Sequence, residues 1–335
     1  MSEKRRRTGL NRFPFPSLSL PPIVFPSSSR LPSPPASPSS PGYYLRRARP
    51  SLSRFWHIHL PGGGWCTTEE TCAWRAGRKL GSSRLWPRAM IPAWLPGIMS
   101  ADPDVNPGFG EWNLAVAVYC DGGGYVGRRG EVAVGNTTLH MDGWKIIMAI
   151  VHDLSTKGLM AAQQVLITGE SPGGQAVVNL CDYIAAYLSF ATVKCLSDAG
   201  FFIDAPDRRG RSFFREIAEN ATQLHQMFNP KCNQALPSHA QWRCFFPQYS
   251  LAYVTSDIFI LNTLFDPITL MIGGQLPWGH EHAKECLFGL RWGAGGGSGR
   301  GLEWRSGVLD RRRWNGGRRG GGQAGGREGR FERRG

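Results

Sequence analysis

The chain has 335 residues and a formal net charge of +14, but this charge is concentrated at its two ends. Residues 1–54 carry a net charge of +9 and residues 291–335 carry +8, which leaves residues 55–290 mildly acidic at −3. The basic balance of the whole chain therefore excludes nothing about the central region and does not indicate a nucleic-acid partner for it.

Composition divides the chain into three parts. Residues 1–40 are a Pro/Ser-rich basic leader whose apolar runs are all interrupted by prolines, so no secretory signal is recognisable in it. Residues 291–335 are rich in glycine and arginine and cannot bury enough apolar surface to offset the entropy of ordering. We expect disorder at both ends and one globular domain over residues 41–290. No stretch is long and apolar enough to predict a membrane span.

The Gly/Arg-rich tail has one functional alternative, which is association with RNA in the manner of RGG segments. No aromatic repeat separates its arginines, and the composition changes abruptly after Leu290. A solvated tail, or sequence that is not native to the domain, is the simpler interpretation.

Between the two ends, short apolar runs alternate with helical patterns. Strands are predicted over residues 55–60, 114–120, 164–168, 193–197 and 257–262. Helices are predicted over residues 143–158, 176–188 and 212–228. In the first of these helices, Trp144, Ile147, Val151 and Leu154 share one face. The alternation predicts an α/β fold with a mostly parallel sheet and helices on both faces.

The cysteines of the chain all fall in the central region, and none forms a CxxC pair, which argues against a zinc ribbon or a thioredoxin-like site. They are Cys66, Cys72, Cys120, Cys181, Cys195, Cys232, Cys244 and Cys286. An even number confined to the folded part favours disulfides and an oxidising compartment. Scattered buried thiols in a cytosolic protein are the alternative.

A Gly-x-Ser-x-Gly motif lies at residues 169–174, GESPGG, directly after the apolar run VLIT. Small neighbours are what a nucleophile elbow needs, because its serine occupies a cramped turn between a strand and a helix. Glycine and serine are also common in ordinary turns of this kind, so the motif by itself leaves both interpretations open. Ser171 is the candidate nucleophile.

Two further features would meet Ser171 at the carboxyl edge of a parallel sheet, where ligands bind in open α/β folds. The segment HLPGGGWC, residues 59–66, follows an early strand, and its glycines would let backbone N–H groups face a developing oxyanion. A flexible glycine turn is the alternative there. Asp266 follows the last predicted strand, at the place where an elbow hydrolase carries the acid that orients its histidine.

The central region, from about residue 42 to residue 286, resembles the plant pectin acetylesterase family, which is related to the Notum carboxylesterases. The matching segments are GGGWCTTEETC, RKLGSS, NPGFGEWN, YCDGGGYVG, VLITGESPGG, VKCLSDAGFFIDA, RCFFPQ and FILNTLFD. Of these, YCDG and VKCLSDAGFF are far more specific than the serine motif.

This resemblance implies an α/β-hydrolase-like fold and a secreted serine carboxylesterase that removes acetyl groups from pectin in the cell wall. It implies Ser171 as nucleophile, Asp266 as triad acid, and the backbone N–H groups of Gly64 and Trp65 as the oxyanion hole. Cysteines of this family are largely disulfide-bonded, which makes Cys66–Cys72 and Cys232–Cys244 candidate local pairs and leaves the connectivity open. An acyl-enzyme mechanism of this type needs no metal or organic cofactor.

The serine motif departs from the family at two positions. Family members usually read Gly-Cys-Ser-Ala-Gly-Gly, whereas this chain has Glu170 and Pro172 around Ser171. The residue after the nucleophile normally donates one oxyanion N–H, and proline has none. The alternative function is therefore a catalytically impaired member that retains at most polysaccharide binding.

The catalytic histidine of the family lies in a late segment resembling Phe-x-His-Cys-Gln, which this sequence does not contain. We therefore expect the hydrolase domain to be truncated at its C-terminal end. His280 and His282 follow Asp266 in the required chain order but do not match that segment. They are the remaining candidates for the catalytic base.

Overall fold

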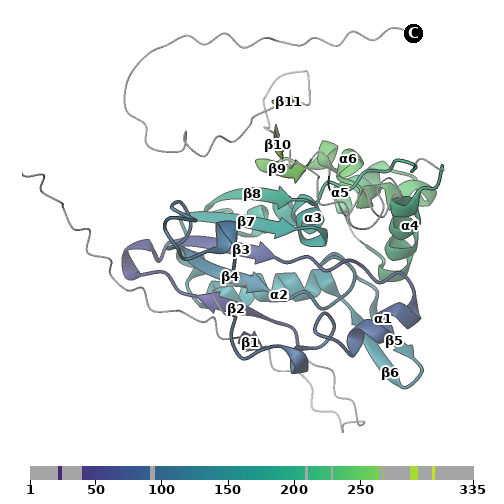
Figure 1. The fold of residues 1–335 in the computed structure, drawn as a ribbon, viewed down its shortest axis with the longest axis horizontal. Coiled ribbons are helices and arrows are strands. Elements are labelled where there is room, and N and C mark those ends of the chain that lie inside the picture. The colour runs from purple at the N-terminus through teal and green to yellow at the C-terminus, as the bar shows by residue number, and fades with distance from the viewer. Residues whose placement is uncertain are drawn as a thin grey trace, which may run out of the picture.

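The computed structural model describes residues 22–24, 40–90, 95–207, 210–227, 229–263, 266, 287–292 and 304–305. Within this part of the chain, a sheet has the strand order β1-β2-β4-β3-β7-β8-β9-β10-β11 (Figure 1). Its parallel centre consists of β4 (Asn113–Ala117), β3 (Phe55–Leu60), β7 (Gln164–Glu170), β8 (Thr192–Asp198) and β9 (Ile258–Thr263). The predicted α/β fold with a mostly parallel sheet is confirmed. The predicted leader and tail lie almost entirely outside the described residues.

Antiparallel strands extend the parallel centre on both sides, and the sequence patterns did not predict them. They are β1 (Pro22–Val24) and β2 (Gly42–Arg46) next to β4, and β10 (Leu287–Trp292) and β11 (Trp304–Arg305) beyond β9. A separate hairpin consists of β5 (Gly130–Val134) and β6 (Thr137–Met141). Every residue of β2 is buried, so this strand shows no alternation of apolar and polar residues.

The predicted helices form as α2 (Gly143–Thr156), α3 (Pro172–Tyr187) and α4 (Phe213–His225). The helix α3 begins four residues earlier than predicted, because Pro172 occupies its first position, where a missing N–H removes no helical hydrogen bond. The strand predicted over residues 114–120 ends at Ala117 instead, since the chain there enters a glycine turn with positive φ at Gly122 and Gly124.

The main core lies between the sheet and the helices α2 and α3. Ile147, Val151 and Leu154 of α2 are fully buried there, as predicted, and Trp144 packs against the same cluster while partly exposed. The opposite face has a smaller cluster in which Tyr44, Leu95, Leu114 and Val116 are buried. The described residues of the segment that covers this cluster include the short 3-10 turns η2 (Ser83–Leu85) and η4 (Gly97–Met99).

Small elements gather beyond the carboxyl ends of the parallel strands (Figure 1). They are α1 (Glu69–Ala76), α4, α5 (Pro230–Ala235), α6 (Pro247–Ser250) and the 3-10 helix η6 (Ser238–Phe245). Phe202, Phe214, Phe245 and Phe246 form a buried aromatic cluster among them. Three further 3-10 turns, η1 (Pro50–Leu52), η5 (Leu159–Ala161) and η7 (Leu251–Tyr253), connect the larger elements.

Disulfides join Cys66 to Cys72 and Cys232 to Cys244, which confirms both expected pairs. A third disulfide, Cys181–Cys195, ties α3 to β8. Cys120 is the free cysteine among the described residues, and Cys286 lies outside them. No helix in the described part of the chain is long and apolar enough to cross a membrane.

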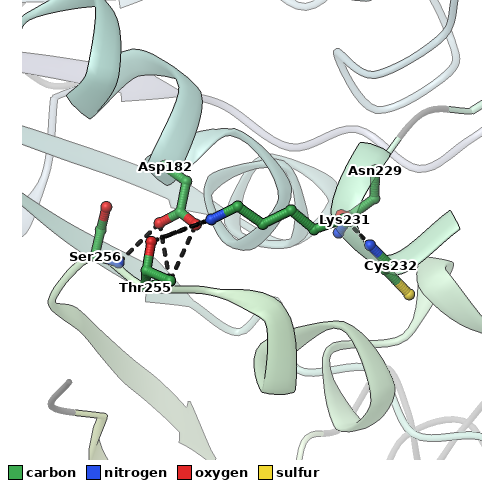
Figure 2. A network of polar contacts seen from close by, with 6 residues as sticks. All are labelled: Asp182, Asn229, Lys231, Cys232, Thr255 and Ser256. Carbon is green, nitrogen blue, oxygen red and sulfur yellow. Dashed lines mark hydrogen bonds and ion pairs between the residues drawn. The ribbon is translucent and has the colours of Figure 1, made fainter. Parts of the chain in front are cut away.

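The carboxylate of Asp182 holds α3 against two later segments (Figure 2). It accepts hydrogen bonds from the backbone N–H of Thr255, at 3.0 Å, and of Ser256, at 2.7 Å, directly before β9. It also pairs with the Lys231 ammonium on α5. Although burial opposes the shift, these hydrogen bonds lower the pKa of Asp182 to about 2. The network therefore fixes the start of β9 relative to α3.

Two histidines share one hydroxyl inside the sheet. The Thr168 hydroxyl lies 2.7 Å from His57 Nε2 and 2.7 Å from His59 Nδ1, and all three side chains are buried. The second ring nitrogen of each histidine has no hydrogen-bond partner. Burial lowers the pKa of His59 to about 4 and lowers that of His57 well below its usual range, so both imidazoles are neutral at pH 7 in the folded protein.

We predict that this cluster makes the fold sensitive to acid. A histidine whose pKa is lowered in the folded state makes its full contribution to stability above the pKa that it has in the unfolded state, near 6.5. This contribution is lost as the pH falls from there toward 4. For His59 alone, the free energy of unfolding should decrease by about 3 kcal/mol between pH 7 and pH 4. Urea unfolding across that range measures it. His59→Gln should flatten the dependence, and His152→Gln, which changes an exposed imidazole on α2, should not. If the free energy of unfolding depended on pH equally in all three proteins, His59 would not be the source of the acid sensitivity.

Candidate active site

Ser171 occupies a sharp turn between the end of β7 and the start of α3. Its backbone angles are φ 54° and ψ −126°, a conformation that residues with a side chain rarely adopt. The turn is held by the Ser171 N–H, which donates to the Asp198 carbonyl at 2.9 Å, and by the Ser171 carbonyl, which accepts from Gln175 N–H at 3.0 Å. Such a turn projects the hydroxyl from the carboxyl edge of the sheet, as a nucleophile elbow requires.

Glycines make this turn possible by allowing backbones to come unusually close. A Cβ on Gly173 would lie 1.8 Å from the Leu60 carbonyl oxygen, and one on Gly169 would lie 2.3 Å from the Gly173 oxygen. A Cβ on Gly62 would lie 2.8 Å from Ser171 Cβ. No side chain fits at these positions, so the glycine-rich loop after β3 lies directly against the serine turn.

This glycine loop, residues 61–65, is the predicted oxyanion loop. Gly64 has φ 65°, a left-handed conformation that favours glycine. The backbone N–H groups of Gly64 and Trp65 have no hydrogen-bond partner among the described residues. The Trp65 ring packs at 4.9 Å from each of the rings of Phe202 and Phe245, which anchors the end of the loop. The loop, which meets the serine turn at Gly62, therefore carries two free N–H groups, those of Gly64 and Trp65.

The two departures from the family motif lie in the same turn. Pro172 is buried at the first position of α3, so the helix accepts it, but it offers no N–H to a substrate. Glu170 is exposed and pairs across the strands with Asp198. Partial burial, and then the charge of Glu170, raise the pKa of Asp198. Negative charge beside the oxyanion loop opposes the formation of an anion there.

Asp266 lies three residues beyond β9, which is separated from β7 only by β8. It is therefore at the same sheet edge as Ser171 and is half-buried. His280 and His282 fall outside the described residues. The Ser171 hydroxyl has no hydrogen-bond partner in the described part of the chain.

One group of potential metal ligands, Cys66, Cys72 and His225, has its ligand atoms within 4.8 Å of one another. Both sulfurs are consumed by the Cys66–Cys72 disulfide, so neither can act as a thiolate ligand. His225 is fully buried, and its Nε2–H donates to the Cys66 carbonyl at 2.8 Å. The group is a structural contact and not a metal site.

A hollow of about 470 Å³ adjoins the oxyanion loop. It is lined by Trp65, Cys66, Glu70, Thr71, Trp74 and Arg75. Trp74 is 63% exposed, which is unusual for so large an apolar side chain, and the Arg78 guanidinium lies over its ring at 3.4 Å from the centroid. A larger hollow of about 1050 Å³ between α4 and α5 contains none of the predicted site residues.

Comparison with known proteins identifies the family of this chain. The profile of the family described as Pectinacetylesterase matches residues 37–286. The chain belongs to the pectinacetylesterase family. The resemblance stated from the sequence motifs is therefore confirmed.

Relatives of this pectinacetylesterase family member include plant and animal esterases. Pectin acetylesterase 5 of Arabidopsis thaliana is 36% identical over 234 residues, which are 68% of this chain and 53% of that protein. Pectin acetylesterase 4 of the same plant is 34% identical over 68% of this chain and 55% of its own length. The palmitoleoyl-protein carboxylesterase notum1 of Xenopus laevis is 30% identical over 70% of this chain and 50% of its own length. The chain thus spans about half the length of these relatives.

Sequence reasoning identified the serine turn and the glycine loop but missed the residues that join them. The Asp198 carbonyl holds the Ser171 N–H, and Gly200 lies so close to α3 that a Cβ there would be 2.4 Å from the Gly174 carbonyl carbon. Both belong to the segment DAGFF, which begins at Asp198, the last residue of β8. Its glycine after a predicted strand was the available signal.

We predict that the Ser171 conformation costs stability. The strain of a non-glycine residue in such a region is on the order of 1–3 kcal/mol, and glycine relieves it. The free energy of unfolding of Ser171→Gly should therefore exceed that of Ser171→Ala by about 1 kcal/mol, as measured by urea denaturation at pH 7. The alanine variant is the matched control because it also lacks the hydroxyl. Equal stability of the two variants would show that the turn is unstrained.

Proposed function

We propose that this protein is a serine carboxylesterase that removes acetyl groups from pectin. The observation that supports it best is the contact between the strained Ser171 turn and a loop with free N–H donors. Acyl transfer needs this combination, because attack by the nucleophile creates a negatively charged oxygen, and hydrogen-bond donors must already be in place to stabilise it. Membership of a family whose matched relatives are named as pectin acetylesterases and carboxylesterases supports the substrate class.

In the proposed mechanism, the Ser171 Oγ attacks the carbonyl carbon of an acetyl ester while its proton passes to a histidine oriented by Asp266. His280 and His282 are the candidates of this chain for that base. The N–H groups of Gly64 and Trp65 bind the oxyanion of the tetrahedral intermediate. The sugar hydroxyl leaves with the proton, and an acetyl-enzyme remains. Water then attacks the acetyl group, which releases acetate and regenerates the serine.

We place the reaction outside the cell, with acetylated pectin of the cell wall as the partner. The disulfides are typical of proteins that mature in an oxidising compartment, which supports this location. The hollow beside Trp74 offers room for a sugar ring next to the reacting ester.

A catalytically impaired family member that only binds polysaccharide is the second candidate. The observation in its favour is the buried Pro172, which removes the N–H that normally follows the nucleophile. The loop donors are unaffected by this change, so the second candidate predicts binding without turnover.

Release of acetate from acetylated pectin by the full chain tests the proposal. We expect the wild type to release acetate, Ser171→Ala to lose that activity, and Ser155→Ala to retain it. Ser155 is a matched control because its hydroxyl bonds within α2, far from the loop. Release that persists in Ser171→Ala would exclude Ser171 as the nucleophile. Binding to pectin without release by any of the three proteins would favour the impaired member.

We further predict that Pro172→Ala increases the turnover number. The substitution restores one N–H at the oxyanion position, and the loss of one such donor costs about 10²–10³ in rate in other hydrolases. Because Pro172 reduces only the stabilisation of the transition state, the gain should appear in kcat while KM changes little. Hydrolysis of 4-nitrophenyl acetate measures both constants.

Pro230→Ala is the matched control for this experiment. Pro230 also occupies the first position of a helix, α5, but it lies away from the serine turn. Both substitutions change backbone entropy in a similar way, so only the restored donor separates them. An equal rate in wild type and Pro172→Ala would mean that this position does not contact the oxyanion.

A further inference from the structure

The carbonyl groups of Gly63 and Gly64, in the oxyanion loop, each accept a hydrogen bond from a side chain. Arg75 Nη1 donates to the Gly63 carbonyl oxygen at 2.9 Å. The Tyr119 hydroxyl donates to the Gly64 carbonyl oxygen at 2.8 Å. Arg75 belongs to α1 and Tyr119 to the segment after β4, so both partners come from outside the loop.

Peptide geometry converts these carbonyl contacts into an orientation of N–H groups. In a trans peptide the carbonyl of one residue points away from the N–H of the next. The Gly63 carbonyl therefore determines the direction of the Gly64 N–H, and the Gly64 carbonyl determines that of the Trp65 N–H. These two N–H groups are the donors proposed for the oxyanion.

Glycine peptides need such support because they rotate easily. Gly64 adopts φ 65°, and a Cβ placed there would meet nothing within 4 Å, so its own surroundings do not confine it. Without the contacts to its carbonyl groups, the loop could reorient its N–H groups at little cost.

The two side chains form a rigid assembly. The Arg75 guanidinium lies 4.7 Å from the centre of the Tyr119 ring, which in turn stacks on the Tyr125 ring at 4.8 Å. The Tyr119 hydroxyl also accepts from Gly124 N–H at 2.9 Å, which fixes the direction of its proton. Burial raises the pKa of Tyr119, so this hydroxyl stays protonated and donates.

Tyr125 continues the same arrangement at the start of the loop. Its hydroxyl donates to the Pro61 carbonyl at 2.8 Å, which directs the Gly62 N–H. Arg75 is also bound through its Nε to the Leu80 carbonyl at 3.0 Å. The Cys66–Cys72 disulfide connects the end of the loop to α1, which carries Arg75.

We propose that Tyr119 and Arg75 are positioning residues that aim the Gly64 and Trp65 N–H groups at the oxyanion. The inference rests on the proposed esterase function. In this role neither side chain touches the reacting acetyl group, and both act through the carbonyl of the peptide whose N–H binds the anion.

Tyr119→Phe tests this inference, with Tyr44→Phe as the matched control. Tyr44 is also buried and also donates to a backbone carbonyl, that of Pro87 at 2.7 Å, but it lies on the other side of the sheet. Tyr119→Phe loses two hydrogen bonds and Tyr44→Phe loses one, so thermal stability should decrease in both variants and more in Tyr119→Phe. Arg75→Lys, which keeps the charge but changes the donor geometry, provides a second variant.

Two measurements on the full chain separate positioning from stability. In hydrolysis of 4-nitrophenyl acetate, Tyr119→Phe should lower kcat by about 10- to 100-fold, with KM within about twofold, because a small displacement of a catalytic donor costs up to about 10² in rate. Binding of 4-nitrophenyl methylphosphonate, a stable tetrahedral anion, should weaken by a similar factor. Arg75→Lys should shift both measurements in the same direction. Tyr44→Phe should leave both unchanged.

The outcomes distinguish this inference from the esterase proposal. Wild-type kcat and phosphonate affinity in a folded Tyr119→Phe, or in Arg75→Lys if the first variant does not fold, would overturn it. Equal losses in Tyr44→Phe would overturn it as well, because the effect would then be a general loss of stability. The wild type could bind the phosphonate without hydrolysing the ester. If Tyr119→Phe then weakened this binding, the result would support the positioning role and contradict the esterase function. A wild type that binds no phosphonate would overturn both.

Discussion

The close approach of two backbones is the constraint on which this site depends. The loop after β3 and the first turn of α3 are separated by so little space that a Cβ on Gly173 would overlap the Leu60 carbonyl oxygen. This contact brings the N–H groups of residues 64 and 65 to the same sheet edge as Ser171. A larger residue at Gly62 or Gly173 would force the loop and the helix apart, and the donors would no longer share a site with the serine.

The strain of this arrangement is balanced by contacts behind it. The helix α3 is joined to β8 by the Cys181–Cys195 disulfide and to the segment before β9 by the Asp182 carboxylate (Figure 2). These contacts lie on the far turns of the helix and leave its first turn free to meet the loop. A positive φ at Ser171 persists because the surrounding structure determines it so strongly.

Patterns of local sequence predicted the parallel strands and the three longest helices, because each of them has a continuous apolar face or run. They failed for β2, which is buried on both sides, and for α1, where only Cys72 is buried in eight residues. The start of α1 depends on a capping contact between the side chains and backbones of Thr68 and Thr71. Such a contact is visible in the sequence only once the helix is known.

The sequence by itself determined the chemistry available at the site. It supplied Ser171 between a strand and a helix, the glycines that allow close approach, and a proline that removes one N–H donor. Only the tertiary structure decided how these groups are aimed. The direction of a glycine peptide is set by what binds its carbonyl, and here the partners, Arg75 and Tyr119, come from segments 12 and 55 residues away. No local pattern encodes a contact of that range, since it exists only after the sheet has brought the segments together.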